Sequence, residues 1–369
     1  MKSVKYIGLD VHKKKIAVAI ADADVQGEVR SYGYIESSLS ALDRFCRRQV
    51  SCGCELRFVY EAGPCGYGIY RHLRSKGFHC EVVAPALIPR QPGERIKNDR
   101  RDALKLARLY RSAELVPIYV PDPQDEAMRD LTRAREDARL ASRKAKQRLK
   151  SFLLRHGQLF TGRSPWSNAY WNWLAGLSMA HAAQQIVLQE YIETVQESER
   201  RVQRLTEQVR QLLPQWRFAP LVEALQAMRG VSLIVAVTTV AELGDLSRFD
   251  SAQKLMAFLG LVPQLYATGD TIRSGPITKT GNGHVRRVLV EAAWTYRLPA
   301  RISVRLRQRQ DNVAEPVRQI AWKAQLRLCA RYRQMAARKK PRPVIATAIA
   351  RELSAFMWDI AKQVTVNGV

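Results

Sequence analysis

Five short apolar runs in the first 85 residues restrict the fold more than any other feature of this 369-residue chain. The runs are rich in Val, Ile, Tyr and Phe and are bounded by Gly, Pro or polar residues, which is typical of strands. In chain order they are VKYIGLD (4–10), KIAVAIAD (15–22), GEVRSYGYI (27–35), LRFVYEAG (56–63) and HCEVVAP (79–85). Segments with helical periodicity, 38–50 and 69–77, precede the fourth and fifth runs. The sequence therefore predicts an α/β domain with an antiparallel meander followed by two more strands.

Carboxylates stand at the ends of two of these runs and on the helix predicted to follow them. Asp10 ends the first run and Glu61 ends the fourth, while Asp99 and Asp102 lie in KNDRRDA (97–103). Because Asp99 and Asp102 are three residues apart, they share one face of a helix predicted for 99–112. The order of elements is that of a ribonuclease H-like domain, where the first and fourth strands are neighbours and the helix after the fifth crosses them. We therefore expect the four acids to converge.

Converging carboxylates need a counter-charge, because like charges held together raise one another's pKa until they neutralise. Mg²⁺ removes this problem, and two ions about 4 Å apart can clamp the attacking and leaving oxygens of a phosphoryl transfer. Each acid alone has an ordinary alternative, which is a helix N-cap for Asp99 and a strand-end turn for Asp10. Their combination favours a metal site. The neighbouring bases Lys97, Arg100 and Arg101 are expected to hold nucleic-acid phosphates.

The overall charge indicates a polyanionic partner. The chain has 60 Lys+Arg against 34 Asp+Glu, a formal net charge of +26, which is typical of nucleic-acid-binding proteins. No apolar run of about 18 residues and no signal peptide is evident, so we expect a cytoplasmic, nucleoid-associated protein without membrane contact. The spacing of Cys52 and Cys54 does not match a zinc motif, and the six cysteines are expected to be reduced thiols.

The middle of the chain has the periodicity of two long helices, one from Pro123 to about Gly157 and one over 178–213. They predict an antiparallel coiled-coil arm. Aromatic residues concentrate between them, where they could stack on bases or, as we favour, pack at the tip of the arm. These residues are Trp166, Tyr170, Trp171 and Trp173.

The last third is mainly helical. Residues 228–263 predict two apolar helices broken by glycines, and 264–287 predict a loop rich in Gly and Thr. Residues 286–342 hold 16 Lys+Arg against three acids, a net +13, which is half of the chain's excess. The predicted fold is thus α/β plus all-α in three domains: 1–122 ribonuclease H-like, 123–220 helical arm, and 221–369 mainly helical.

Several motifs in this order resemble one protein family. GLDVHKK (8–14), YEAGPCGYG (60–68) and KNDRRDA (97–103) are similar to motifs of the DEDD-type transposases of bacterial insertion sequences, the family named for insertion sequence 110. The apolar stretch 228–263 and GPITKTGNGHVRR (275–287) are similar to that family's second domain. The resemblance covers nearly the whole chain and is weakest over 158–220.

The resemblance implies a specific activity. It implies a RuvC-like first domain with a Mg²⁺ site, matched here by Asp10, Glu61, Asp99 and Asp102, and a C-terminal transposase domain with a nucleophilic hydroxyl. It also implies cleavage and exchange of DNA strands through a covalent protein-DNA link. The implied partners are DNA, a structured guide RNA and further copies of the chain, in a homodimer or homotetramer.

The nucleophile departs from the family pattern, in which a serine precedes a glycine after GLVP. This chain has Thr268 before Gly269, and Ser274 supplies a Ser-Gly pair six residues later. Threonine carries a usable hydroxyl, although its β-methyl group restricts χ1. We take Thr268 as the first candidate and Ser274 as the second; loss of strand exchange is the third possibility.

Other polar residues of the same segment have two interpretations. Lys279, His284, Arg286 and Arg287 could neutralise the scissile phosphate, but for Arg286 and Arg287 we favour contact with the nucleic-acid backbone. For His284, and for His12 beside Asp10, we favour a solvated surface position.

Two other function classes compete with the recombinase. A RuvC-like structure-selective nuclease needs only the carboxylates, and a non-enzymatic nucleic-acid-binding protein needs only the charge. The four acids argue against the binding protein, and the second domain argues against the nuclease.

Overall fold

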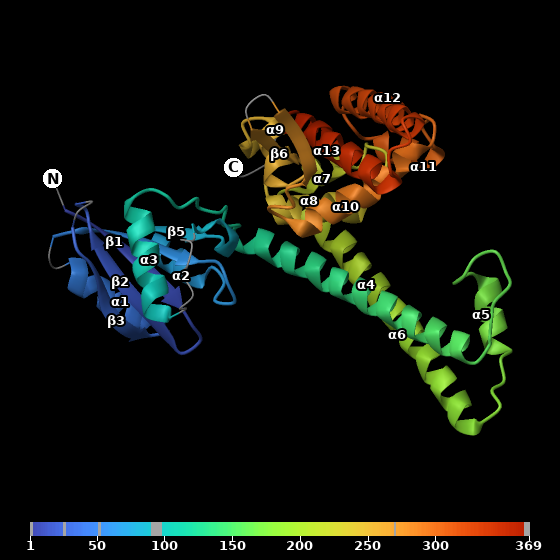
Figure 1. Ribbon diagram of the computed structural model, residues 1–369, viewed down its shortest axis with the longest axis horizontal. Coiled ribbons are helices and arrows are strands. Elements are labelled where there is room, and N and C mark those ends of the chain that lie inside the picture. Colours follow the sequence, from blue (N-terminus) through green and yellow to red (C-terminus); the bar gives the residue numbers. More distant parts are fainter. Residues whose placement is uncertain (1–2, 25–26, 51–52, 90–97, 269–270, 365–369) are drawn as a thin grey trace. The chain divides into compact units, whose positions relative to one another are not determined.

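A computed structural model of the protein describes residues 3–24, 27–50, 53–89, 98–268 and 271–364. The chain forms two compact units, Met1–Val120 and Pro121–Val369 (Figure 1). Among the described helices, none combines the length and the apolar character that crossing a bilayer requires.

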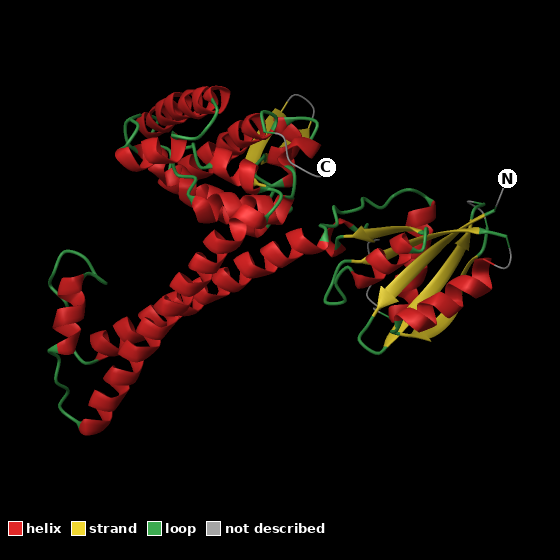
Figure 2. Cartoon of the chain, turned by 180° about the vertical axis from the view of Figure 1, so that it is seen from behind, coloured by secondary structure: helices red, strands yellow, loops and turns green. Residues whose placement is uncertain are grey.

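The first unit is built on a mixed sheet, whose strands are yellow in Figure 2. The sheet has five strands in the order β3-β2-β1-β4-β5. β1 pairs antiparallel with β2 and parallel with β4, while β2–β3 is antiparallel and β4–β5 parallel. The predicted meander and the neighbouring first and fourth strands are therefore confirmed, and the sheet is compatible with a ribonuclease H-like domain. The strands are β1 (Val4–Val11), β2 (Lys15–Asp22), β3 (Val29–Glu36), β4 (Glu55–Glu61) and β5 (His79–Val83).

Three helices cover the sheet: α1 (Leu39–Val50), α2 (Gly68–Ser75) and α3 (Asp99–Arg111), with a short 3₁₀ turn η1 (Pro85–Leu87) after β5. The two faces of β2 differ because side chains alternate along a strand. Ile16, Val18 and Ile20 are buried in one core cluster with residues of α1 and α2. The alanines of β2 instead cluster with alanines of α3 on the opposite face. These small side chains let α3 lie close to the sheet.

The second unit begins with two long helices, α4 (Pro123–Arg155) and α6 (Ala182–Leu212), which lie side by side (Figure 1). They run antiparallel, because residues later in α4 contact residues earlier in α6. Arg135 donates a hydrogen bond to Thr206, and Lys146 forms an ion pair with Glu199. The coiled-coil geometry of this pair and the division of the chain into three domains stay predictions.

The aromatic residues at the end of this helix pair form a small core around α5 (Asn168–Ala175). Tyr170 is only 3% exposed, and the rings of Trp166 and Trp173 lie 4.9 and 5.4 Å from it. The packing interpretation of these residues is therefore confirmed.

The rest of the second unit is a helical domain around α13, whose buried residues include Ile349, Leu353 and Met357. Its helices are α7 (Ala219–Leu225), α8 (Leu233–Leu243), α9 (Ala252–Phe258), α10 (Gly283–Ala293), α11 (Val304–Gln310), α12 (Glu315–Ala337) and α13 (Arg342–Ala361). Short 3₁₀ turns are η2 (Leu213–Gln215), η3 (Leu246–Arg248) and η4 (Trp294–Arg297).

The loop predicted for 264–287 is wrong. This segment forms an antiparallel hairpin of β6 (Pro263–Thr268) and β7 (Thr271–Ile277), followed by the first turns of α10. The segment lacks an apolar alternation because most of β6 is exposed and buries no face. β-branched and aromatic residues, such as Tyr266, Thr268 and Thr271, were the available strand signal.

Candidate functional site

The ends of β1 and β4 bring two of the predicted acids to one edge of the sheet. The two strands are parallel, and the last pair in their register is Leu9 with Tyr60. Asp10 and Glu61 each come one residue later, so both stand at the same edge. This confirms the arrangement expected from the sequence for the two strand ends.

Helix α3 crosses this edge because residue 8 is glycine. A Cβ atom at Gly8 would lie 2.3 Å from the carbonyl oxygen of Ala103 and 2.6 Å from the nitrogen of Ala107, both far inside van der Waals contact. Any larger residue would therefore push α3 away from β1. The close approach places the first turn of α3, with Asp99 and Asp102, beside the strand end.

The start of α3 is set by Asn98. Its side chain accepts a hydrogen bond from the backbone N–H of Arg100 at 3.0 Å, so Asn98 is the N-cap. The alternative that Asp99 caps this helix is therefore wrong. Asp99 instead lies in the first turn, where its side chain is free to contact β1 and β2.

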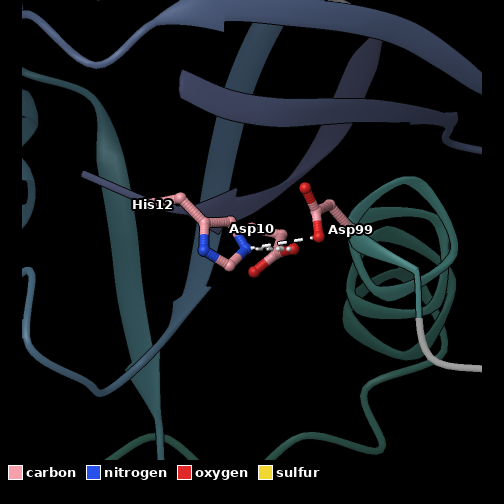
Figure 3. Close-up of side chains that lie close together, drawn as sticks. All are labelled: Asp10, His12 and Asp99. Carbon is pink, nitrogen blue, oxygen red and sulfur yellow. Dashed lines mark hydrogen bonds and ion pairs between the residues drawn. The ribbon is translucent and has the colours of Figure 1, made fainter. Parts of the chain in front are cut away.

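Asp10 and Asp99 meet through His12 (Figure 3). The Nε2 atom of His12 lies 3.1 Å from Asp10 Oδ2 and 3.5 Å from Asp99 Oδ1. The Nζ atom of Lys15 lies 3.1 Å from Asp99 Oδ2. Ligand atoms of Asp10, His12 and Asp99 all lie within 4.8 Å of one another, and no other group of this kind occurs among the described residues.

The electrostatics of this cluster differ between its two acids. Burial raises the pKa of Asp10, His12 opposes that rise, and the charges of Asp102 and Asp99 add to it. The hydrogen bond from Lys15 holds the pKa of Asp99 below its ordinary value. A cation placed between the acids would relieve the unfavourable charge on Asp10.

Glu61 and Asp102 lie near this cluster but outside its 4.8 Å group. Asp102 is close enough to raise the pKa of Asp10. Burial raises the pKa of the Cys65 thiol, and the charges of both Asp10 and Glu61 raise it further, which places Cys65 near both acids. The structure thus brings ligand atoms of Asp10 and Asp99 within 4.8 Å of one another, whereas Glu61 and Asp102 stand outside this group.

The bases predicted to flank the acids are only partly described. Arg100 and Arg101 are exposed on the first turn of α3, as phosphate contact requires. Lys97 lies outside the described residues. Their role in nucleic-acid binding stays a prediction.

Both candidate hydroxyls lie on the hairpin of the second unit. Thr268 is the last residue of β6 and pairs with Thr271, and Ser274 pairs with Leu265 further along the ribbon. Thr268 and Ser274 are both exposed. Either hydroxyl is accessible to a large substrate, and geometry alone does not favour one of them.

Two glycines hold the base of the hairpin against the end of α9. A Cβ atom at Gly260 would lie 2.3 Å from the carbonyl oxygen of Thr280, and one at Gly281 would lie 1.8 Å from that of Phe258. Both glycines have positive φ, at +61° and +68°, which other residues rarely adopt. Lys279 between them is exposed and also has a positive φ, of 56°.

The two arginines that follow have partners inside the protein. Arg286 donates hydrogen bonds of 2.8 Å to the carbonyl oxygens of Leu259 and Thr280. Arg287 forms ion pairs with Glu136 at 2.6 Å and with Glu291 at 3.1 Å. These contacts supply a structural role for both arginines, and their predicted contact with nucleic acid stays a prediction.

A buried acid, Glu242 of α8, links this segment to α4. It accepts hydrogen bonds from Arg133 at 2.7 and 2.9 Å and from the side-chain amide of Asn282 at 2.7 Å. Burial alone would raise the pKa of Glu242, but hydrogen bonding and charge from Arg133, with help from Asn282 and Arg129, lower it below its ordinary value. Asn282 also caps α10.

Sequence reasoning missed two features of these sites. His12 is exposed as expected, yet it also contacts two acids, and Lys15 contacts Asp99 from β2. His12 follows the end of β1, two residues after Asp10, and this short spacing was an available signal. The Glu242 group had no local signal, because its members come from α4, α8 and the N-cap of α10. His284 is exposed.

Two family models match the chain. One, DEDD_Tnp_IS110, described as a transposase, matches residues 7–157. The other, described as the transposase IS116/IS110/IS902 family, matches residues 222–305.

Full-length relatives agree with these models. The chain is 47% identical over 358 residues to "Putative transposase y4qE" of Sinorhizobium fredii, covering 97% of this chain and 88% of the relative. It is 29% identical to the transposase for insertion sequence element IS1533 of Leptospira borgpetersenii, over 92% and 99% of the two chains. It is 24% identical to the transposase for IS1328 of Yersinia enterocolitica, over 99% of each chain.

Proposed function

The chain belongs to the IS110 family of transposases, and from this membership we propose that it moves an insertion sequence by metal-dependent cleavage and exchange of DNA strands through a covalent protein-DNA intermediate. A transposase acts on DNA, which agrees with the net charge of +26. The observation that carries the mechanism is the meeting of Asp10 and Asp99 at the edge of the sheet.

The residues at this edge fit a divalent cation. Asp10 and Asp99 supply carboxylate oxygens, the ligands that Mg²⁺ prefers, and the pKa of Asp10 is raised in a way that a cation would reverse. Glu61, at the end of the neighbouring strand, and Asp102, whose charge raises the pKa of Asp10, would complete the set. When bound, one or two Mg²⁺ ions would polarise the scissile phosphate and stabilise the leaving oxygen.

In this proposal His12 and Lys15 hold the acids apart and neutralise them until the substrate is bound. His12 lies within reach of both Asp10 and Asp99, and Lys15 contacts Asp99. Arg100 and Arg101, exposed on the same helix, would then position the DNA backbone.

The nucleophile in this proposal is the Thr268 hydroxyl, with Ser274 as its alternative. The Oγ1–P bond forms as the bond from phosphorus to the leaving nucleotide oxygen breaks, and that oxygen takes up the proton that Oγ1 gives up. The exposed position of Thr268 at the end of β6 lets a DNA strand reach it. Reversal of the same step by a different strand end reseals the DNA.

The remaining parts of the proposal concern partners. We propose that a structured RNA encoded beside the gene selects the DNA sites and that the chain acts as a homodimer or homotetramer in the cytoplasm. The basic helical domain supports nucleic-acid binding of this kind, since residues 286–342 carry a net +13.

The experiment is to express the gene with its native flanking DNA, purify the protein and sequence the RNA that accompanies it. We expect a discrete RNA from the flank, with segments that match the element's ends and its insertion site. Incubation with those DNA sites and Mg²⁺ is then expected to give an adduct that survives denaturation. Cleavage without any adduct would favour the nuclease alternative instead.

A further inference from the structure

A cavity of about 480 Å³ lies in the helical domain of the second unit, between the turn at Gly230, η4 and α11. Its lining residues include none of the predicted carboxylates and neither of the hairpin hydroxyls. Among the residues that the structure describes, its lining contains five arginines and one tryptophan and no acidic residue. These residues are Arg229, Arg297, Arg301, Arg305, Arg309 and Trp294.

One wall of this arginine cavity is fixed by a close backbone approach. Gly230 has φ +81°, and a Cβ atom there would lie 2.5 Å from the carbonyl oxygen of Ala292. The hydroxyl of Tyr296, which is buried, donates a 2.8 Å hydrogen bond to the carbonyl oxygen of Arg229. The Arg229 guanidinium in turn donates to the carbonyl oxygen of Pro299 at 2.8 Å, which orders the loop 298–303.

The opposite wall, α11, is tied to the same turn by two side chains. Arg309 donates a 2.6 Å hydrogen bond to the carbonyl oxygen of Val231, and Gln310 donates a buried 2.8 Å bond to that of Ala227. The cavity is therefore a formed part of the fold, which a binding site needs if it is to avoid a large ordering cost.

The charge inside the cavity is not compensated by the protein. Arg297, Arg301 and Arg305 are exposed, and among the described residues none forms a hydrogen bond or an ion pair with them. Other arginines of the same unit, such as Arg287 and Arg327, are paired with glutamates. Like charges gathered without acids repel one another, so the cavity is arranged to attract an anion.

The aromatic residue narrows the class of anion. Trp294 is partly buried and lines the cavity, so its ring is held in place by the core. An indole ring stacks on a nucleobase, and arginines hold phosphate oxygens by paired hydrogen bonds. The volume lies within the range of small-ligand pockets and suits one nucleotide.

We propose that this cavity binds one nucleotide of a single-stranded nucleic acid, with its base stacked on Trp294 and its phosphates held by Arg297, Arg301 and Arg305. A base in a duplex is already stacked on its neighbours, so the site selects unpaired nucleotides. The strand is DNA or RNA, because both offer the same phosphate and base. This site rests on the proposed function, because it assumes that the protein handles nucleic acid. It depends on neither the metal site nor the nucleophile, so it can fail or hold independently of them.

The test measures binding of a labelled single-stranded oligonucleotide of roughly eight nucleotides by fluorescence anisotropy, in EDTA so that no cleavage occurs. A duplex of the same sequence is the parallel probe. We expect Arg301→Ala/Arg305→Ala to weaken single-strand binding about tenfold or more and to lower the salt slope by about 1.4, since each phosphate contact contributes about 0.7. Duplex binding should change less than twofold.

A matched control removes two charges elsewhere in the same domain. Arg338 and Lys340 are exposed and do not line the cavity, so Arg338→Ala/Lys340→Ala should affect single strand and duplex alike or not at all. Trp294→Leu keeps an apolar side chain but loses the stacking surface. It should weaken single-strand binding about tenfold without changing the salt slope.

Several outcomes would overturn the proposal. Equal loss of single-strand binding from the cavity and control variants would show a diffuse basic surface instead of a site. Competition by poly-glutamate as strong as by the oligonucleotide would show that only charge is recognised. If Trp294→Leu lowers the thermal unfolding midpoint, its weaker binding reflects a damaged fold. The Arg301→Ala/Arg305→Ala variant then decides whether the cavity binds the single strand. Matched DNA and RNA strands then show which of the two nucleic acids the site prefers.

Discussion

The acidic edge of the sheet and the hairpin carry the two halves of the proposed chemistry, and they are built in opposite ways. At the edge of the sheet, the reactive groups are part of the framework, since Asp10 ends a central strand and Asp99 begins the helix packed on it. On the hairpin, only the base is packed against the rest of the unit, where Gly260 and Gly281 closely approach the backbone of Thr280 and Phe258. Thr268, at the end of β6, is exposed to solvent.

The difference follows from what each group must do. Carboxylates that share metal ions must converge within a few ångströms, which only a rigid frame can maintain against their repulsion. A hydroxyl that attacks a DNA strand must instead be accessible to a bulky substrate.

Removing the hydroxyl should abolish the covalent step. We expect Thr268→Ala to form no DNA adduct that survives denaturation, whereas Thr268→Ser keeps it, because serine offers the same nucleophile with less crowding. Ser274→Ala is the matched control on the facing strand and should leave the adduct intact. Adduct loss with Ser274→Ala alone would transfer the role to Ser274.

Neutralising an acid at the edge of the sheet should slow cleavage strongly. We expect Asp10→Asn to reduce Mg²⁺-dependent cleavage by about 10²–10³-fold, as loss of a group that stabilises transition-state charge does. Asp22→Asn is the matched control. It makes the same change at the last residue of β2, away from the cluster, where Asp22 pairs with Arg30. If both variants cleaved like the wild type in a gel assay, the metal site would be elsewhere. Excess EDTA should stop cleavage in the wild type.

Breaking the Glu242 group should destabilise the second unit. Glu242→Ala removes the carboxylate that accepts hydrogen bonds from Arg133 and Asn282 and that neutralises the buried Arg129, at a cost of about 3–5 kcal/mol in the free energy of unfolding. Urea denaturation measures the loss. Glu291→Ala, which removes an exposed partner of Arg287, is the control and should cost less than about 1 kcal/mol.

Crowding the contact between β1 and α3 should destabilise the first unit by a smaller amount. Gly8→Ala places a methyl group against the backbone of Ala103 and is expected to cost about 1–3 kcal/mol. Gly68→Ala adds the same atom at the start of α2, where nothing lies within 4 Å, and should be neutral or slightly stabilising. Equal midpoints for the two variants in thermal unfolding would mean that α3 does not need this close approach.

The smallest expected effect is on how the free energy of unfolding depends on pH. The pKa of Glu242 is lowered in the folded chain, so this group stabilises the fold above its unfolded pKa, about 4.3. That stability is lost as pH falls through the lower folded pKa. We therefore expect Glu242→Gln to flatten the fall in unfolding free energy below about pH 5 relative to the wild type. An unchanged slope in urea titrations between about pH 3 and pH 5 would contradict the assignment.

The sequence predicted the acidic edge better than the hairpin, and the reason is physical. Apolar alternation and strand-end acids are local signals, so the five strands and the positions of Asp10 and Glu61 followed from them. Strand β6 is mostly exposed and therefore lacks an apolar alternation, so the hairpin was predicted as a loop. The contacts of Arg286 and Arg287 inside the protein could not be predicted either, since Leu259 and Glu136 lie far from them in the sequence.

Strand alternation, helix periodicity and motif order are properties of neighbouring residues, so the five strands, the long helices, the family and the residue types of the proposed site followed from the sequence. Tertiary structure alone decided which groups touch. It placed His12 between Asp10 and Asp99 and Lys15 against Asp99, joined Asn282 to Glu242 by a hydrogen bond, and gathered arginines around Trp294. Those contacts join residues from separate helices and strands, and only packing brings such residues together.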